Sequence, residues 1–294
     1  MKVVAFSYEI GSFGKSVAMD VAQNAGLTFI PFSQVYRLAL DRNERFRRRK
    51  KDVSEGRGDI DIWEGHFFSD PSFLSLFESI ILEMASQGDV ILIGTGAQAV
   101  LRPFGGLLKV HVRAPLEVRV KRFMDLNNIT FNEANQTVKW WDQRRRALFE
   151  LNSLFESAVG ESGCDLIINT DRVPIPAASR LLQTAIAELP GPPDPALWQE
   201  RLGQLALAKR VECAVRESGS ALGLAPLEVR PADDEPETLC LTGFVHTEED
   251  AAQALDLSRR VAEGHQVQSH LKLLRLHGDL MPPSCWRTDD EPRH

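Results

Sequence analysis

A short stretch near the amino terminus has the residue types, in the right order, that phosphate binding requires. It reads Glu9-Ile10-Gly11-Ser12-Phe13-Gly14-Lys15-Ser16, follows the apolar run Val3–Phe6, and precedes apolar residues at helical spacing from Val17 to Ala22. A strand, a glycine-containing loop and a helix start in this order are typical of a phosphate-binding loop. Backbone N–H groups at the helix N-terminus attract the anion, and small residues let the chain approach it closely.

Two side chains of this loop carry the expected chemistry. We expect the Lys15 ammonium to act as a catalytic point charge on the β- and γ-phosphates, and the Ser16 hydroxyl to be a ligand of Mg²⁺. The other expected nucleotide contacts come from the loop backbone at Gly11, Ser12, Phe13 and Gly14. Glu9 stands where the pattern G-x-x-x-x-G-K-[ST] has its first glycine. The alternative is an ordinary Gly/Ser loop before a surface helix.

Apolar runs alternate with helical patterns through the first 189 residues. The expected strands are 3–6, 27–30, 90–93, 107–112 and 165–170. This alternation predicts an α/β fold with a parallel sheet that is covered on both faces. Ligands of such sheets bind at the carboxyl ends of the strands, where the loop, Gly94–Gly96 and Thr170–Asp171 all fall. Thr170 is therefore a further expected nucleotide-binding residue.

Arginine residues on two expected helices could reach phosphates at the same edge. Thr130–Glu133 forms a capping box for a long helix that carries Asp142 and Arg145, and Arg122 lies on the preceding helix. We expect Arg122 and Arg145 to be catalytic, by contacting the transferring or acceptor phosphates. We expect Asp142 to orient an arginine. A surface ion pair is the alternative for each arginine.

A strongly basic run extends from Arg42 to Lys51 and is opposed only by Asp41, Glu44 and Asp52. Three interpretations remain open: a solvated, mobile face, a flap that attracts a phosphorylated substrate, and a nucleic-acid site. The run holds a single aromatic residue, Phe46, which disfavours the third interpretation.

The overall composition is that of a globular protein with an acidic balance. The chain has 294 residues, with 34 basic and 41 acidic side chains and a net charge of −7, which disfavours nucleic acid and anionic membranes as partners. No stretch approaches the roughly 18 apolar residues of a membrane span. The 4 cysteines are scattered without metal-ligand spacing. These features predict a cytoplasmic protein, and a homo-oligomer is compatible with them.

A proline-rich segment divides the chain. Pro190-Gly191-Pro192-Pro193-Asp194-Pro195 predicts a stiff linker, so we expect one domain at 1–189, a linker at 190–196 and a small α+β domain at 197–276. The polar, proline-containing segment 277–294 predicts a disordered tail.

Residues 1–188 resemble the cytidylate-kinase-like proteins of the P-loop nucleoside monophosphate kinases. The resemblance rests on the loop Glu9–Gly14, the strand and turn Val90–Ala97, the helix start Ala114–Arg122, the D-x-x-R pattern Asp142–Arg145 and the last strand Leu166–Thr170. It implies a three-layer α/β fold and ATP-dependent phosphoryl transfer to a nucleoside monophosphate, with CMP as the suggested acceptor and ATP and Mg²⁺ as cofactors.

Two features differ from the family pattern. Thr95 stands where the family usually has an arginine that meets substrate phosphate, and no acidic residue for Mg²⁺ is present at Gly94–Gly96. A catalytically weak or inactive nucleotide-binding sensor is therefore the alternative function. A kinase for another small molecule, selected by the basic run, is a third.

Residues 197–276 resemble the BON domain, through Leu239–Val245, the helix to Val261 and Gly264–Leu271. This resemblance implies a regulatory or interaction module that binds a small ligand, a lipid or a protein partner.

Overall fold

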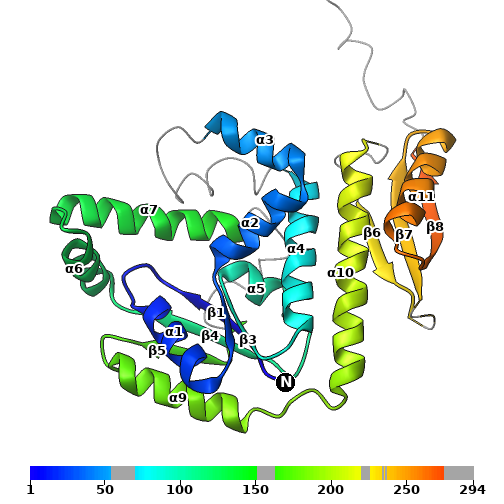
Figure 1. The fold of residues 1–294 in the computed structure, drawn as a ribbon. Helices are drawn as coiled ribbons and strands as arrows, with labels where there is room; N and C mark the ends of the chain where they lie inside the picture. The colour runs from blue at the N-terminus through cyan, green and yellow to red at the C-terminus, as the bar shows by residue number, and fades with distance from the viewer. Residues whose placement is uncertain (54–69, 151–162, 220–225, 234, 236, 275–294) are drawn as a thin grey trace, which may run out of the picture.

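A computed structural model describes residues 1–53, 70–150, 163–219, 226–233, 235 and 237–274. The expected disordered tail at 277–294 lies outside these ranges. The chain forms a unit around a five-stranded sheet and, after it, a smaller unit around a three-stranded sheet (Figure 1). In chain order, the elements up to the proline-rich segment are β1 (Val3–Tyr8), α1 (Gly14–Ala25), β2 (Thr28–Ile30), α2 (Phe32–Arg42), α3 (Glu44–Val53), α4 (Pro71–Ser86), β3 (Val90–Ile93), α5 (Thr95–Val100), β4 (Leu108–Arg113), α6 (Leu116–Asn127), α7 (Phe131–Glu150), β5 (Leu166–Asn169) and α9 (Ile175–Glu188).

The five strands form one parallel sheet in the order β2-β3-β1-β4-β5. This confirms the parallel sheet predicted from the alternation of apolar runs and helices. Because all strands run the same way, the residues that follow β1, β3 and β5 lie at one edge of the sheet. The loop after Tyr8, the turn at Gly94 and the segment from Thr170 therefore meet there, as the sequence predicted.

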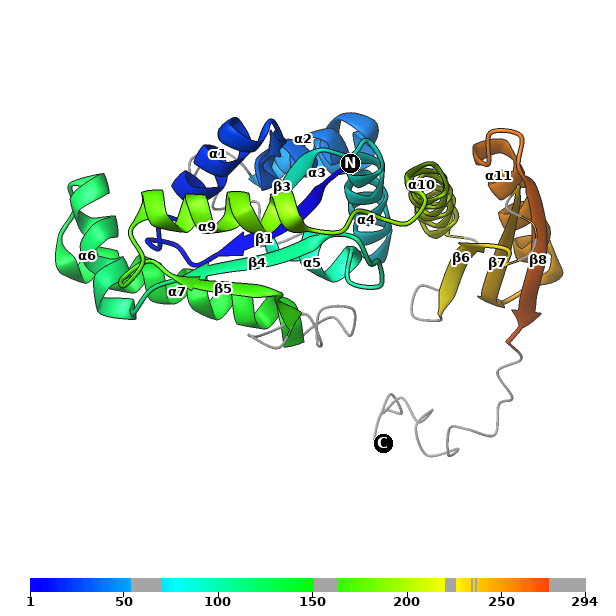
Figure 2. The same cartoon turned by 90° about the horizontal axis from the view of Figure 1, so that it is seen from below.

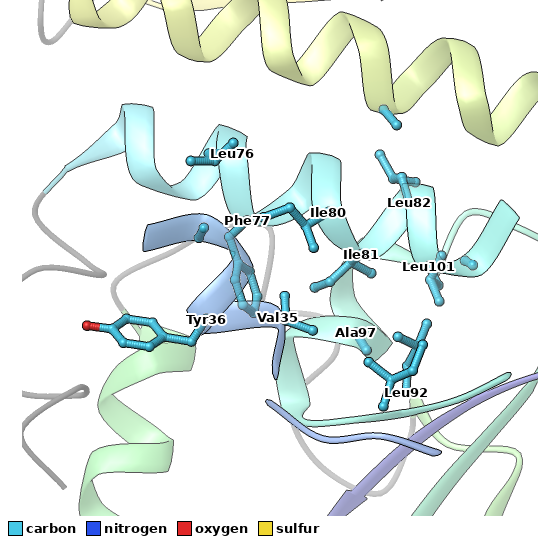
Figure 3. Close-up of a cluster of buried hydrophobic side chains, with 14 of the residues drawn as sticks. Val35, Tyr36, Leu76, Phe77, Ile80, Ile81, Leu82, Leu92, Ala97 and Leu101 are labelled. Carbon is cyan, nitrogen blue, oxygen red and sulfur yellow. The ribbon is translucent and has the colours of Figure 1, made fainter. Parts of the chain in front are cut away.

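Helices cover both faces of this sheet. On one face, α1 and α9 pack against Val4 and Phe6 of β1. On the other face, α2, α4 and α5 build a core that includes Val35, Phe77, Ile80, Ile81 and Leu101 (Figure 3). Each fully buried side chain of this size stabilises the fold by about 1.5–3 kcal/mol.

Local sequence signals place the helix ends. The Asp70 carboxylate accepts from the Ser72 amide at the start of α4, directly before Pro71. The capping box before α7 is confirmed, because the Thr130 amide donates to Glu133 and the Glu133 amide donates to the Thr130 hydroxyl. Such caps supply acceptors for helix amides that have no intrahelical partner.

Most of the basic run lies on helix α3, whereas its first residue, Arg42, is the last residue of α2. Its one aromatic residue, Phe46, is 2% exposed and packs edge-on against Phe73 of α4, with the ring centroids 4.8 Å apart. This contact anchors the helix on the core, while Arg47 and Arg48 pair with Glu44 on its exposed side. The part of the basic run that lies on α3 thus belongs to a helix anchored on the core.

A long helix connects the two units. The remaining elements are α10 (Pro195–Glu217), β6 (Leu227–Pro231), β7 (Thr238–Val245), α11 (Glu248–Val261) and β8 (Gln266–Leu273). Helix α10 lies between α4 and the small sheet (Figures 1 and 2). One side of it, with Leu202 and Ala206, belongs to the core of the first unit, and another, with Leu207 and Val211, belongs to the core of the second. A helix that is apolar on several sides is buried on several sides.

The second unit is a mixed sheet with helices on one face. Strand β7 pairs antiparallel with β6 and parallel with β8. Helices α10 and α11 pack against the side of the sheet that carries Val229, Leu239 and Leu241. Among the described residues, no helix is long and apolar enough to span a membrane.

Candidate functional site

The loop between β1 and α1 requires glycine at two points. Gly11 has a φ of +78°, and a Cβ there would lie 2.5 Å from the carbonyl oxygen of Arg119 on α6. A Cβ on Gly14 would collide with the Tyr8 side chain. Glycine at both points therefore lets the loop pack tightly between β1 and the start of α6.

The start of α1 presents polar groups suited to an anion. Lys15 and Ser16 are exposed in the first turn of the helix. The N-cap residue, Phe13, makes no side-chain cap bond, whereas the Gly14 amide is bonded by the Ser12 hydroxyl oxygen at 3.3 Å. First-turn amides have no intrahelical acceptor, and the helix N-terminus carries a partial positive charge. An incoming phosphate would supply the missing acceptor.

Thr170 and Arg122 hold the side of this loop. The Thr170 hydroxyl donates to the Ser12 carbonyl at 2.7 Å and accepts from Arg122 Nη1 at 3.0 Å. Arg122 Nη2 donates to the Thr170 carbonyl at 2.9 Å, and its guanidinium carbon lies 4.6 Å from the centroid of the Phe13 ring. The structure thus brings Arg122 and Thr170 to the loop, as the sequence had suggested. Thr170 follows Ser12 by 158 positions in the chain.

Glu9 pairs with a buried arginine that the sequence reasoning did not single out. Arg119 is 5% exposed, and its Nε lies 3.1 Å from Glu9 Oε2. Its two terminal nitrogens donate to Asp142 Oδ1 at 3.1 Å and Oδ2 at 2.9 Å. The expectation that Asp142 orients an arginine is confirmed, and the arginine is Arg119. The residue that replaces the first loop glycine is therefore part of a charged cluster joining the loop to α6 and α7.

Arg145 reaches the same cluster from α7. Its Nη2 lies 3.7 Å from Glu9 Oε1, and its Nη1 lies 3.5 Å from Nε2 of His111 on β4. Arg122 and Arg145 thus stand on two sides of the loop, the first at Thr170 and the second at Glu9. No local pattern marked His111, because its partners come from other elements of the sheet and from α7.

His111 has a strongly lowered pKa. Burial, and then the positive charges of Arg145, Arg113 and Arg119, lower it from 6.5 to about 3. The imidazole is therefore neutral at pH 7.

We expect this histidine to make the fold less stable in acid. Between pH 6.5 and about 3, the unfolded chain binds one more proton at His111 than the folded chain does. The free energy of unfolding contributed by this group therefore falls by about 1.4 kcal/mol for each pH unit lost. The measurement is the difference in unfolding free energy between the wild type and His111→Gln at several pH values from 7.5 down to 5. A difference that does not change with pH would contradict the lowered pKa.

The part of the chain that the structure describes holds no group of three or more His, Cys, Asp or Glu side chains that could bind a metal ion on its own. At the neighbouring turn, Gly94 is the N-cap of α5 with a φ of +130°, and Thr95 opens that helix. Any metal at this edge would need ligands from a bound nucleotide and from a hydroxyl such as that of Ser16.

The sheet order, the loop after β1 and the open amides of α1 define a kinase-like, P-loop nucleotide-binding fold. The sequence identifies the family within this fold. The profile of the Cytidylate kinase-like family matches residues 3–172, and the chain belongs to this family.

Curated relatives agree with this assignment at low identity. The chain is 26% identical over 186 residues to the cytidylate kinase of Pyrobaculum islandicum, which covers 62% of this chain and 90% of the relative. It is 26% identical over 176 residues to the cytidylate kinase of Ignicoccus hospitalis, and this alignment covers 58% of this chain and 90% of the relative. Among solved structures, an uncharacterized protein from Eubacterium ventriosum aligns at 17% identity with a TM-score of 0.46, over 64% of this chain and 99% of that one. A shikimate kinase from Bacteroides thetaiotaomicron aligns at 16% identity with a TM-score of 0.37, over 63% and 98%.

Proposed function

We propose that this protein transfers a phosphoryl group from ATP to a nucleoside monophosphate, with CMP or a close analogue as the acceptor. The observation that carries the proposal is the convergence of two arginines, Arg122 and Arg145, on a loop whose helix amides are open to an anion. Phosphoryl transfer needs mainly positioning and fixed positive charge around the transferred group, and this edge of the sheet supplies both. The names of the two cytidylate kinase relatives support CMP as the acceptor.

In this proposal, the backbone from Gly11 to Gly14 and the Lys15 ammonium bind the donor phosphates. Ser16, exposed in the first turn of α1, is the protein ligand of Mg²⁺, which would neutralise charge between the β- and γ-phosphates. Gly94–Gly96 carries no carboxylate, so the nucleotide and water complete the coordination. Arg122 is held beside the loop by Thr170, and Arg145 lies by Glu9, where each can meet a phosphate oxygen.

We expect the purified full chain to release ADP from Mg-ATP when a monophosphate is present. A coupled assay over CMP, dCMP, UMP, AMP and GMP should rank CMP or dCMP first, by about tenfold in kcat/KM over the purine nucleotides, because a base pocket discriminates by shape and hydrogen bonding. The blank without acceptor measures ATP hydrolysis. Rates at the level of this blank with every monophosphate would contradict the proposal.

A second candidate is a nucleotide-binding sensor without phosphoryl transfer. It is favoured by Thr95 at the position where the family usually has a phosphate-binding arginine, and by α10, which belongs to the cores of both units. Helix α4 contacts both α10 and this turn. Its residues share a core with Leu202 of α10, and a Cβ on Gly96 would lie 2.8 Å from the Phe77 ring. The BON-like unit would then report nucleotide binding to a partner. Calorimetric titration that shows ATP binding in a chain with no transfer to any monophosphate would favour this candidate.

A further inference from the structure

A chain of polar side chains crosses the face of the sheet beneath α5 and ends at Arg145. It consists of Ser7 on β1, Gln98 on α5 and His111 on β4. Ser7 is 3% exposed and Gln98 is 4% exposed. Buried polar groups at such positions must find partners in the protein, and each one here has a partner. The nucleotide loop itself does not use these three side chains.

The contacts of Gln98 fix the direction of the hydrogen bonds among these three side chains. Gln98 Nε2 lies 2.7 Å from the Val110 carbonyl oxygen and 3.3 Å from that of Ala5. Carbonyl oxygens only accept, so this atom is the amide nitrogen, and Gln98 Oε1 must be the acceptor. The Ser7 hydroxyl therefore donates its single proton to Oε1 at 3.0 Å.

The state of His111 follows in turn. Since the Ser7 proton is already engaged, the 2.8 Å contact between Ser7 Oγ and His111 Nδ1 requires a proton on Nδ1. A neutral imidazole has only one N–H, so Nε2 carries a lone pair, and this lone pair faces Arg145 Nη1 at 3.5 Å. Arginine can only donate, so every bond in the chain has a consistent direction.

We propose that His111 is a positioning residue for Arg145, with its Nε2 lone pair oriented by Ser7 and Gln98 so that the guanidinium stays beside Glu9 and the nucleotide loop. This inference rests on the proposed role of Arg145 in phosphoryl transfer. A neutral acceptor fixes the direction of a guanidinium without cancelling its charge, whereas a second carboxylate would reduce the field on the phosphate. The lowered pKa of His111 is consistent with this role, because a protonated ring would lose the lone pair and repel Arg145.

Two substitutions test the roles of the two ring nitrogens separately. In His111→Asn the amide can replace Nδ1 but does not reach Arg145, whereas in His111→Gln the amide can replace Nε2. We expect His111→Asn to lower kcat by about tenfold or more, since small misplacements of a catalytic group are costly. We expect His111→Gln to retain most of kcat. The ATP dissociation constant should be unchanged in both, and the exposed His246→Asn is the matched control.

A double-mutant cycle tests whether His111 acts through Arg145. In an Arg145→Ala background, His111→Asn should cause no further loss of kcat. An equal loss in both backgrounds, or equal activities of the Asn and Gln variants, would overturn the proposal.

Nitrogen NMR on the wild-type chain with ¹⁵N-labelled histidine gives a readout that does not depend on turnover. We expect His111, assigned by the loss of its signals in His111→Asn, to carry its proton on Nδ1 at pH 7, with an Nε2 resonance that shifts in Arg145→Ala. A proton on Nε2, or no shift, would overturn the inference. A wild-type chain without any transfer activity would refute the proposed function, while these spectra would still decide the role of His111.

Discussion

Replacing Lys15 with alanine is expected to reduce kcat/KM for phosphoryl transfer by about 10²–10³-fold. The residue is exposed in the first turn of α1, where its ammonium can follow the negative charge that develops on the β–γ bridge. Removal of one fixed donor to transition-state charge has effects of this size in other enzymes. Steady-state rates over a range of ATP concentrations measure the change.

The control for this experiment is Lys272→Ala. Lys272 is an exposed residue of β8 in the second unit, so its removal changes the net charge equally without touching the nucleotide loop. Its kinetics should match those of the wild type. A Lys15→Ala rate within threefold of the wild type would show that the loop does not hold the donor phosphates.

Replacing Glu212 with alanine is expected to destabilise the fold by about 3–5 kcal/mol. Glu212 lies on α10, is 3% exposed and accepts from the Ser75 hydroxyl of α4 at 2.8 Å. It also lies 3.1 Å from Lys209, which pairs with Glu78 of α4 at 2.9 Å, and 3.2 Å from Arg216. Removing Glu212 leaves two half-buried cations, Lys209 and Arg216, without one of their partners.

Urea unfolding at pH 7 measures this loss. The matched control is Glu200→Ala, an exposed glutamate on the same helix that bonds only Gln204 among the described residues, and we expect a change within about 0.5 kcal/mol. A loss of less than 1 kcal/mol in Glu212→Ala would mean that α10 is not held on α4 through its charges. Burial raises the pKa of Glu78 in the same cluster, so the Glu212→Ala effect should be measured at fixed pH.

Elements marked by local chemistry could be predicted from the sequence. The Asp70-Pro71 signal places the start of α4, and the Thr130–Glu133 capping box places the start of α7. The period of apolar residues indicated the strands, and their alternation with helices indicated a parallel sheet. The phosphate-binding loop followed from residue order alone, because loop and helix are contiguous in the chain.

Contacts between distant elements could not be predicted in this way. Ser7 meets His111 because β1 and β4 are neighbours in the sheet, and the strand order cannot be read from the strands themselves. The spacing of Arg119 and Arg122 shows that both lie near one face of α6, but it does not tell which one is buried. Arg119 is buried because Glu9 and Asp142 surround it.

The packing of α10 against both units was also not predicted, although its apolar residues indicated it. The proline-rich segment predicted a stiff linker between two domains. In the structure Pro192 packs on Gly106, and Trp198 donates to the Gly105 carbonyl at 3.2 Å. Apolar residues on several sides of α10, such as Leu202 and Val211, indicate burial against two partners. The two units therefore share a helix.

The fate of the γ-phosphate is the most direct test of the account. The full-length chain is incubated with γ-labelled ATP, Mg²⁺ and CMP, and the label is located by chromatography in CDP, inorganic phosphate or ATP. We expect labelled CDP with the wild type and, over the same time, about a hundredfold less or lower with Lys15→Ala. Label that stays in ATP or appears only as inorganic phosphate, in a chain that binds ATP, would contradict phosphoryl transfer to a monophosphate.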